Sequence, residues 1–339
     1  MPKKVLVVAA GWLGDNIMLG SLLRTLQQQG HHITILNTHA HFVGLFSRIV
    51  GVDAIIDFPL PKKNLSLQKR LQCAALLRPQ QFDEIIYAPN TIKAALIGFF
   101  ARIPRRTGWH GEARYILLNQ RHTHKSRCHT MVQTYVQLAY PVHSPIIPVN
   151  QCPEPRILAH DMGSIDPHTR PVMLCPGAAA GESKRWPIEH YIALSKRLLD
   201  AGYAVHLLGG PGEVQLGARI QADTGYRCID WTGKTTLTAV IDIMQQAHCV
   251  VANDSGLMHM AAALSVPVMA IYGATPPDFA PPLSKQGRAF SMHVPCRPCG
   301  KNHCPLNTLA CLHGVTVESI FTAITQLPSS PPEKLVKST

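Results

Sequence analysis

The sequence has little charge and no long apolar run. Only 15% of its 339 residues are charged and 46% are hydrophobic, so the chain does not belong to the disordered class and can build sizeable cores. No apolar run reaches the roughly 18 residues that a membrane-spanning helix needs. The apolar run at residues 5–10 is too short for a secretory signal, so we expect a soluble cytoplasmic protein.

Acidic residues are scarcer than basic ones, which gives the chain a formal net charge of +12. A basic balance attracts phosphates of any kind, whether in nucleotides, nucleic acid or anionic lipid. The lysines and arginines form no long block and no recognisable nucleic-acid reader motif, so we expect no nucleic-acid partner. The GxGxxG dinucleotide fingerprint is also absent, which argues against an NAD enzyme.

Strand-like and helix-like segments alternate in both halves of the chain. In the first half, residues 4–10, 16–29 and 33–37 predict a βαβ unit, the signature of a doubly wound sheet. A second series of the same kind starts at residues 171–175 and continues with a helix at 188–201. The sequence therefore predicts an α/β protein with two Rossmann-like, doubly wound domains.

Residues 141–170 are rich in Pro, His and Asp and predict a linker. We place the first domain at 1–165, the second at 166–327 and a frayed tail at 328–339. The last predicted helix, near residues 317–326, is expected to pack back across the domains.

One stretch, residues 250–273, joins two buried strand-like runs through a polar turn, Asn253-Asp254-Ser255-Gly256. Ser255 and Gly256 can present N–H groups at a helix start, where the dipole favours an anion. His259 follows about one turn later. We interpret this stretch as the binding site for the pyrophosphate of a nucleotide sugar. Two simpler interpretations stay open: Asp254 could cap the helix, and His259 could be a hydrogen-bonded core histidine.

Candidate residues in the first half are one carboxylate and a group of basic side chains. Asp15 follows the first predicted strand, so it either caps the next helix or aims a carboxylate into a cleft. The basic side chains form either a solvated face or an acceptor site in which arginine clamps an anion. Those that we assign to acceptor binding are Lys62, Lys63, Arg105, Arg106 and Arg114.

Several motifs occur in a fixed order: GWLGD, PNTIKAALIGFFARIPRRTGW, PGAAAGESKRWP, NDSGLMHMAAAL and IYGATPPDF. Together they resemble the bacterial ADP-heptose:lipopolysaccharide heptosyltransferases over about residues 3–325. The resemblance implies a GT-B fold, in which the two Rossmann-like domains face a cleft. It also implies inverting transfer of L-glycero-D-manno-heptose from ADP-heptose to the first heptose of the lipopolysaccharide inner core, at the inner-membrane surface.

The resemblance also implies roles for single residues. Asp15 matches the general base, and Lys184 matches a basic residue beside the donor phosphates. Gly177, Asp254, Ser255, Gly256 and His259 match the donor-binding turns. From its position, Arg185 is assigned to the donor beside Lys184. Glu213, after the glycine turn, either hydrogen-bonds a ribose hydroxyl of the donor or is an exposed first-turn glutamate favoured by the helix dipole. No DxD-type motif is present, which suits transfer without a metal cofactor, because cations and N–H dipoles can stabilise the departing ADP.

Four late cysteines form a C-x2-C-x4-C-x6-C pattern: Cys296, Cys299, Cys304 and Cys311. Four thiolates can hold zinc in a structural, tetrahedral site that takes no part in transfer. An iron–sulfur cluster or a loop of free thiols explains the pattern equally well.

Two rival functions remain open. One is a GT-B transferase of the same family or of another, with a different acceptor or nucleotide sugar. The other is a nucleotide-binding regulator on the same fold, without turnover. Substitution of Asp15 would separate them, because an enzyme would lose turnover while a binding protein has none to lose.

Overall fold

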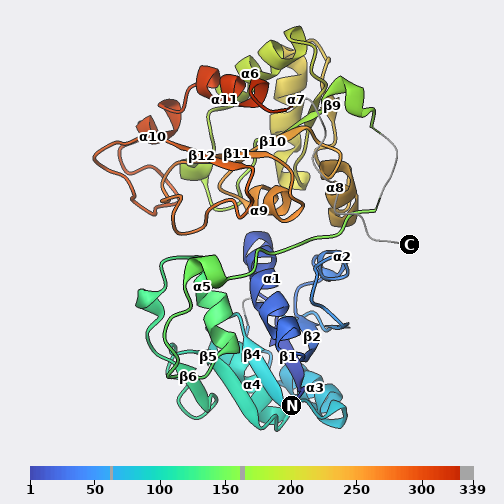
Figure 1. Cartoon of the computed structure of the whole chain (residues 1–339), viewed down its shortest axis with the longest axis vertical. Coiled ribbons are helices and arrows are strands. Elements are labelled where there is room, and N and C mark those ends of the chain that lie inside the picture. Colours follow the sequence, from blue (N-terminus) through green and yellow to red (C-terminus); the bar gives the residue numbers. More distant parts are fainter. Residues whose placement is uncertain (62–63, 161–164, 329–339) are drawn as a thin grey trace. The chain divides into compact units, whose positions relative to one another are not determined.

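The computed structural model describes residues 1–61, 64–160 and 165–328 and divides the chain into two units, Met1–Arg156 and Ile157–Thr339 (Figure 1). The sequence predicts a domain boundary at residue 165, whereas this division lies at residue 156. Lys62, Lys63 and nearly all of the predicted tail lie outside the described residues.

Unit 1 is built on a parallel sheet whose strand order is β3-β2-β1-β4-β5-β6. Its described strands are β1 (Lys4–Val8), β2 (His32–Asn37), β3 (Ala54–Asp57), β4 (Glu84–Tyr87), β5 (Arg105–Trp109) and β6 (Gln120–His122). Its described α-helices are α1 (Leu13–Gln28), α2 (Val43–Phe46), α3 (Leu67–Leu77), α4 (Ile92–Phe100) and α5 (Met131–Val136). The first three elements predicted from the sequence are present, and α1 begins three residues earlier than the predicted 16.

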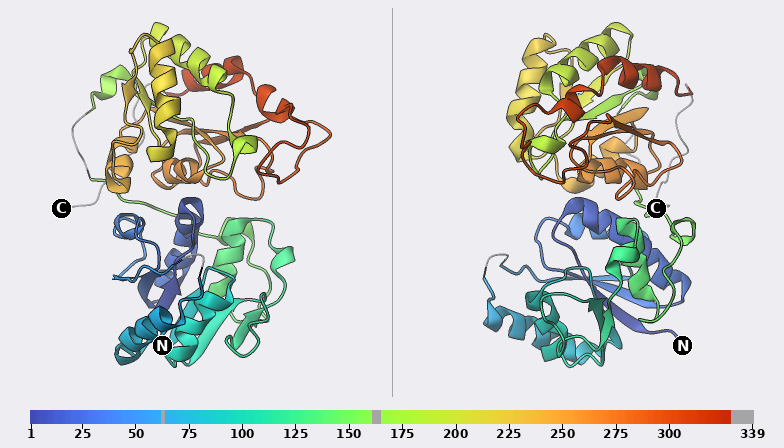
Figure 2. Two further views of the ribbon diagram at one scale, coloured as in Figure 1. Left: turned by 180° about the vertical axis from the view of Figure 1, so that it is seen from behind. Right: turned by 90° about the vertical axis from the view of Figure 1, so that its left-hand side faces the viewer.

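Helices cover both faces of this sheet. Leu6 and Val8 of β1 pack with Cys73 of α3 and Ala95 of α4 on one face, and α1 packs against α5. Figure 2 shows these two helix pairs on opposite sides of the strands. β1 is buried from Val5 to Val8, as expected for a strand covered on both faces.

Unit 2 repeats the design with the strand order β12-β11-β10-β7-β8-β9, all parallel. Its described strands are β7 (Val172–Cys175), β8 (Val205–Leu207), β9 (Ile229–Asp230), β10 (Cys249–Asn253), β11 (Val268–Tyr272) and β12 (Gly287–Ser291). Its described α-helices are α6 (Ile188–Asp200), α7 (Val214–Asp223), α8 (Leu237–Met244), α9 (Gly256–Ala263), α10 (Ala310–His313) and α11 (Val317–Thr325).

The last helix, α11, packs within unit 2. Ile320 and Ile324 join the same core cluster as Leu194 of α6 and Leu174 of β7. Figure 1 shows α6, α7 and α11 on one side of the unit 2 strands, with α8 and α9 on the other. Burying an aliphatic side chain of this size fully contributes about 1.5–3 kcal/mol, so α11 is an integral layer of this unit.

In each unit the strand order reverses direction between two central neighbours, β1 and β4 in unit 1 and β7 and β10 in unit 2. In open parallel sheets, ligands bind at the carboxyl ends of such strands. Within the described residues, no helix has the length and apolar character needed to cross a bilayer.

Candidate functional site

The carboxyl ends of β7 and β10 are tied together by one buried side chain, Asn253. Its amide donates to the carbonyl oxygens of Pro176 (2.9 Å) and Gly177 (3.2 Å), which follow β7. Its Oδ1 accepts from the backbone N–H of Trp186 (2.9 Å) and the hydroxyl of Tyr191 (3.2 Å). Asn253 therefore holds the β7 turn, α6 and β10 in register at the point where the strand order reverses.

Asp254 is the centre of the polar cluster that follows β10. The Lys184 ammonium and the Thr275 hydroxyl both donate to its Oδ2, each at 2.5 Å. The Asp254 carboxylate is only 8% exposed, whereas 21% of the Lys184 side chain is exposed. Asp254 thus fixes one N–H of Lys184, and the ammonium keeps two donors for a ligand. The capping interpretation of Asp254 is wrong, because Ser255 is the N-cap of α9.

Two buried polar atoms next to this ion pair have no hydrogen bond within the described part of the chain: Ser255 Oγ and His259 Nδ1. Burial is the main cause that lowers the pKa of His259; the charge of Asp254 opposes this shift and the charge of Lys184 adds to it. The ring is therefore neutral at pH 7. Buried polar atoms normally have partners, so these two indicate a place where a ligand atom can bind.

The turn after β7 meets the turn after β8. A Cβ at Gly177 would lie 2.4 Å from Glu213 Cγ, so only glycine leaves room for that side chain. Glu213 Oε2 in turn accepts from the backbone N–H of Gly210 at 2.7 Å. Glu213 thus lies beside Gly177, and its carboxylate caps the 3-10 turn Pro211–Glu213 that precedes α7.

The cysteine-rich loop supports the segment that carries Lys184. The backbone N–H of Ser183 donates to Asn302 (3.3 Å), and the Ser183 hydroxyl donates to the carbonyl of Lys301. A Cβ at Gly181, whose φ is +130°, would lie 2.3 Å from the Asn302 carbonyl oxygen. Arg297 donates to the Gly273 carbonyl at 2.6 Å, which joins the loop to the end of β11.

The zinc prediction receives no support from the geometry. Within the described residues, no group of three or more His, Cys, Asp or Glu side chains is placed to hold a metal ion. The thiols are nevertheless close enough to influence one another: burial is the main cause that raises the pKa of Cys311, followed by the charges of Cys296, Cys299 and Cys304.

Other residues predicted near the donor have contacts within the fold. Arg185 Nε donates to the carbonyl of Ala178 at 3.1 Å. Thr236 caps α8 by accepting from the backbone N–H of Ala239. The hydroxyl of Thr235 is buried and has no hydrogen bond within the described residues.

In unit 1, Asp15 lies in the first turn of α1, just beyond β1. The N-cap is Trp12, so the capping interpretation of Asp15 is wrong. Asn16 closes the turn, because its Oδ1 accepts from the backbone N–H of Ala10 at 2.8 Å. The hydroxyl of Tyr135 on α5 is hydrogen-bonded to Asp15, and burial, followed by the charge of Asp15 and this hydrogen bond, raises the pKa of Tyr135.

The three described acceptor candidates bind within the fold. Arg114 is 2% exposed and donates to Asn90 Oδ1 (2.7 Å) and to the carbonyl of Trp109 (2.5 Å), among others. Arg106 donates to backbone carbonyls, and Arg105 pairs with Glu84 at 3.0 Å. These contacts give each arginine a structural role, and acceptor binding stays a prediction for all five basic residues.

Sequence reasoning gave no individual role to three residues that organise these clusters: Asn253, Thr275 and Tyr135. Asn253 is the last residue of β10 and Thr275 follows β11, where polar side chains are expected near a strand-order reversal, so position was a usable signal. Tyr135 lies on α5, 120 residues after Asp15, and nothing local in the sequence links the two.

Residues 70–310 match the family model "Glycosyltransferase family 9 (heptosyltransferase)". The chain is 37% identical to lipopolysaccharide heptosyltransferase 2 of Escherichia coli over 85% of this chain and 88% of that protein. It is 36% identical to lipooligosaccharide heptosyltransferase 2 of Haemophilus influenzae over 83% and 86% of the two chains.

Solved structures agree with this match. The structure of E. coli ADP-heptose lps heptosyltransferase II superposes with a TM-score of 0.84 at 32% identity, covering 96% of this chain and 98% of that chain. E. coli heptosyltransferase WaaC with ADP superposes with a TM-score of 0.70 at 19% identity, over 96% and 100% of the two chains, and shows the shared fold. The chain therefore belongs to glycosyltransferase family 9, the heptosyltransferases, and is a glycosyltransferase with the GT-B fold.

Proposed function

We propose that the protein transfers L-glycero-D-manno-heptose from ADP-heptose to the first heptose of a lipopolysaccharide inner core. The relatives named for heptosyltransferase 2 support the reaction, and the solved relatives named with ADP or ADP-heptose support the donor. The observation that carries the proposal for this chain is the Lys184–Asp254 ion pair at the strand-order reversal, beside the unpartnered Ser255 Oγ and His259 Nδ1. Family membership makes the regulator without turnover the weaker alternative.

In this proposal, the diphosphate of the donor lies against the N-terminus of α9 and the Lys184 ammonium. A helix N-terminus alone contributes about 0.3–2 kcal/mol to anion binding, or at most about one and a half decades of affinity. A cation must therefore share the work of stabilising the departing ADP. Asp254 acts as a positioning residue, because it holds the lysine in a single place and lets its remaining N–H groups face the phosphates.

We propose Asp15 as the base. The acceptor oxygen attacks the anomeric carbon, the bond from that carbon to the ADP oxygen breaks, and ADP leaves with the bonding electrons. Asp15 takes the proton of the acceptor hydroxyl, a role that typically accelerates transfer ~10²–10⁴-fold. A single displacement of this kind inverts the configuration at the anomeric carbon.

The test offers the purified protein ADP-heptose together with a panel of truncated core acceptors. Glycolipid product with the monoheptosylated acceptor alone supports the assignment, and NMR of the product's anomeric centre tests inversion. Product with another core acceptor instead would favour a different heptosyltransferase of the family, such as heptosyltransferase I or III. ADP release without any glycolipid product contradicts the proposal.

We also propose that unit 1 docks on the anionic inner face of the inner membrane through α3. Leu67 and Leu71 lie one turn apart and are 44% and 42% exposed, and Lys69 is exposed on another side of the same helix. Apolar and basic side chains in this arrangement suit an anionic lipid surface. Paired Leu67→Ser and Leu71→Ser substitutions should abolish co-sedimentation with anionic vesicles, whereas Leu306→Ser, at an exposed leucine of unit 2, should not. Unchanged co-sedimentation of the double variant would refute this surface.

A further inference from the structure

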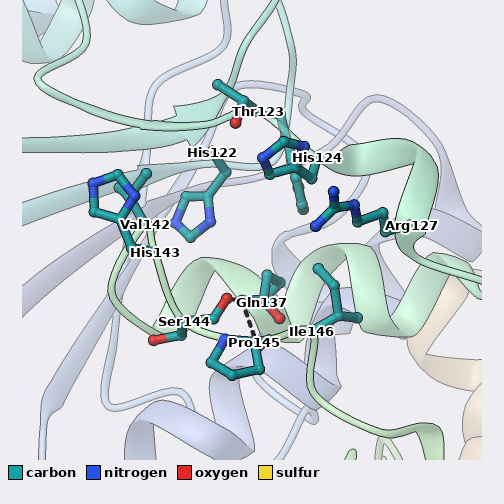
Figure 3. A pocket seen from close by; sticks show the side chains of 11 residues that line it. His122, Thr123, His124, Arg127, Gln137, Val142, His143, Ser144, Pro145 and Ile146 are labelled. Atoms are coloured by element: carbon teal, nitrogen blue, oxygen red, sulfur yellow. Dashed lines mark hydrogen bonds between the residues drawn. The ribbon is translucent and has the colours of Figure 1, made fainter.

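A cavity of about 270 Å³ lies in unit 1 at the end of β6, beside α5 (Figure 3). Its described lining includes Trp109, His122, His124, Arg127, Gln137 and His143. Three histidines and an arginine line it, and no carboxylate is among these residues. Because sites for whole small molecules usually span about 300–1,000 Å³, this cavity suits one charged group with part of a sugar ring.

His122 is the buried member of this lining. It is 2% exposed, and its Nε2 has no hydrogen bond within the described part of the chain. Figure 3 shows its ring among the other lining side chains, with His143 on one side and His124 on the other. Burial, the main cause, and the charge of Arg105 lower the pKa of His122 to about 4, so the ring is neutral at pH 7. A buried nitrogen without a hydrogen-bond partner destabilises the fold unless a ligand atom forms a hydrogen bond with it.

The cationic member of the lining is available for a ligand. Arg127 is exposed, and its guanidinium has no hydrogen bond or ion pair within residues 1–61, 64–160 and 165–328. A free guanidinium presents a planar fork of donors that matches the oxygens of a phosphate or carboxylate. His124 and His143 are exposed imidazoles that can donate to the same group.

The walls of the cavity are held by hydrogen bonds and do not depend on a ligand. Thr130 and Gln133 form a capping box that fixes the start of α5. Trp109 Nε1 donates to the carbonyl of Thr134 at 2.8 Å, and Gln137 Oε1 accepts from the backbone N–H of Ile147 at 3.0 Å. The site is therefore preformed, which lowers the entropic cost of binding.

We propose that this cavity binds the oxyanion of an acidic sugar, either a phosphate monoester or a carboxylate, with Arg127 and the histidines as donors. The identity of the sugar as part of the acceptor rests on the proposed function, whereas the binding of the oxyanion does not. The net charge of +12 agrees with an anionic partner. A metal site does not fit, because no group of three described ligand side chains is placed to hold one.

The test follows the histidine ring signals of the full-length protein by NMR during titration with inorganic phosphate, glucuronate and glucose. Phosphate, glucuronate or both should shift His122 saturably, and glucose should not. Arg127→Gln should weaken this binding roughly tenfold or more, because it removes a charge-assisted hydrogen bond. Lys125→Gln removes a neighbouring charge that does not line the cavity and should leave binding unchanged. Equal binding by Arg127→Gln and wild type, or equal shifts with glucose, would overturn the proposal.

A transfer assay then identifies the source of the oxyanion. Arg127→Gln should raise the KM for the acceptor and leave kcat and the KM for ADP-heptose unchanged. The increase should vanish with a dephosphorylated acceptor if the group is a phosphate, and with a carboxyl-reduced acceptor if it is a carboxylate. An increase that survives both treatments would overturn the acceptor assignment. If the wild type transfers no heptose, the proposed function fails, while the titration still decides whether the cavity binds an oxyanion.

Discussion

The two units have the same strand order, yet the carboxyl ends of their central strands carry different chemistry. In unit 2, the strand-order reversal holds a cation, Lys184, and two buried polar atoms that lack partners. In unit 1, the equivalent place holds a carboxylate, Asp15, next to a tyrosine hydroxyl. Topology therefore decides where a ligand can bind, and the side chains at the strand ends decide which ligand.

The basic residues show the same contrast. Lys184 of unit 2 keeps donors free because one carboxylate oxygen holds it. Arg114 of unit 1 is buried, and its guanidinium donates hydrogen bonds to Asn90 and to carbonyl oxygens that follow β4 and end β5. A basic residue in the sequence can thus be available for ligand binding or serve only to stabilise the fold. Its burial and its hydrogen-bond partners distinguish the two roles.

The largest effect should come from the unit 1 carboxylate. Asp15→Asn preserves an acceptor for the Tyr135 hydroxyl but removes the base, so kcat should fall roughly 10²–10⁴-fold. The affinity for ADP, measured by calorimetry, should not change. Tyr135→Phe keeps the carboxylate and should lower kcat less. Retention of kcat by Asp15→Asn would remove this residue from the mechanism.

Substitution of Lys184 in unit 2 should weaken the binding of ADP. Lys184→Ala removes a charge-assisted hydrogen bond to the donor phosphates and should weaken ADP binding roughly 10-fold to 150-fold. Calorimetry of ADP binding measures this loss directly. Lys196→Ala removes an exposed lysine of α6 and serves as the matched control. If Lys184→Ala bound ADP as wild type does, the diphosphate would have to bind elsewhere.

Substitutions at two glycines, one in the core of unit 1 and one in the turn after β7, should separate an effect on packing from an effect on ligand binding. A Cβ at Gly98 would lie 2.1 Å from Tyr87 Oη and 2.7 Å from Ile85 Cγ2, in the core between α4 and β4. Gly98→Ala should therefore lower the free energy of unfolding by about 1–3 kcal/mol, measured by chemical denaturation, with ADP affinity unchanged. Gly177→Ala displaces the Glu213 side chain, so it should weaken ADP binding and cost less stability.

The control for both glycine variants is Gly212→Ala, because no atom beyond its own local backbone and chain neighbours lies within 4 Å of its added Cβ. It should change neither stability nor ADP affinity. Equal stability losses for the Gly98 and Gly212 variants would contradict the packing argument.

The last expected effect is a pH dependence of stability, to which both units contribute. Burial lowers the pKa of His122 in unit 1 and of His206 in unit 2 from 6.5 to about 4. Between pH 4 and 6.5 these two histidines are protonated in the unfolded chain but neutral in the folded protein. The free energy of unfolding should therefore fall as the pH drops from 6.5 to 4. Each histidine contributes at most about 1.4 kcal/mol per pH unit.

Urea unfolding at several pH values measures this slope. His122→Asn and His206→Asn should each make it shallower, whereas His124→Asn, at an exposed position, should not. In His206→Asn, the new Oδ1 can still accept from Trp231 Nε1, which donates to His206 Nδ1 at 3.1 Å in the wild type. A slope unchanged by both buried substitutions would show that other groups carry the pH dependence.

Much of the fold could be predicted from local patterns. The apolar runs before Asp15 and before Asn253 are β1 and β10, and the segment near residues 188–201 is α6, because burial of a strand or of one helix face imposes a period on the sequence. The short strands β5, β6 and β12 were not predicted. β6 and β12 are edge strands, and β5 begins with Arg105 and Arg106, so none of the three carries a clear apolar period.

The candidate site was predicted in part. Its members Lys184, Asp254 and His259 came from motifs, and the structure brings them together. Their partners Thr275 and Asn253 were missed, as was the histidine cavity, although the run from His122 to His129 is visibly rich in His and basic residues. Scattered charge on its own does not distinguish a binding site from a solvated face.

The sequence by itself determined the two βαβ series, the family and the residue types available for phosphate binding and proton transfer, because periodicity and motifs are local. Only the tertiary structure decided which residues meet. Lys184 and Asp254 are 70 positions apart and pair because β7 and β10 are neighbours in the sheet. These long-range neighbours decide whether a lysine is available to a ligand or an arginine is fully hydrogen-bonded within the fold. The reason is that hydrogen bonding and burial depend on which residues are close in space and not on their separation in the sequence.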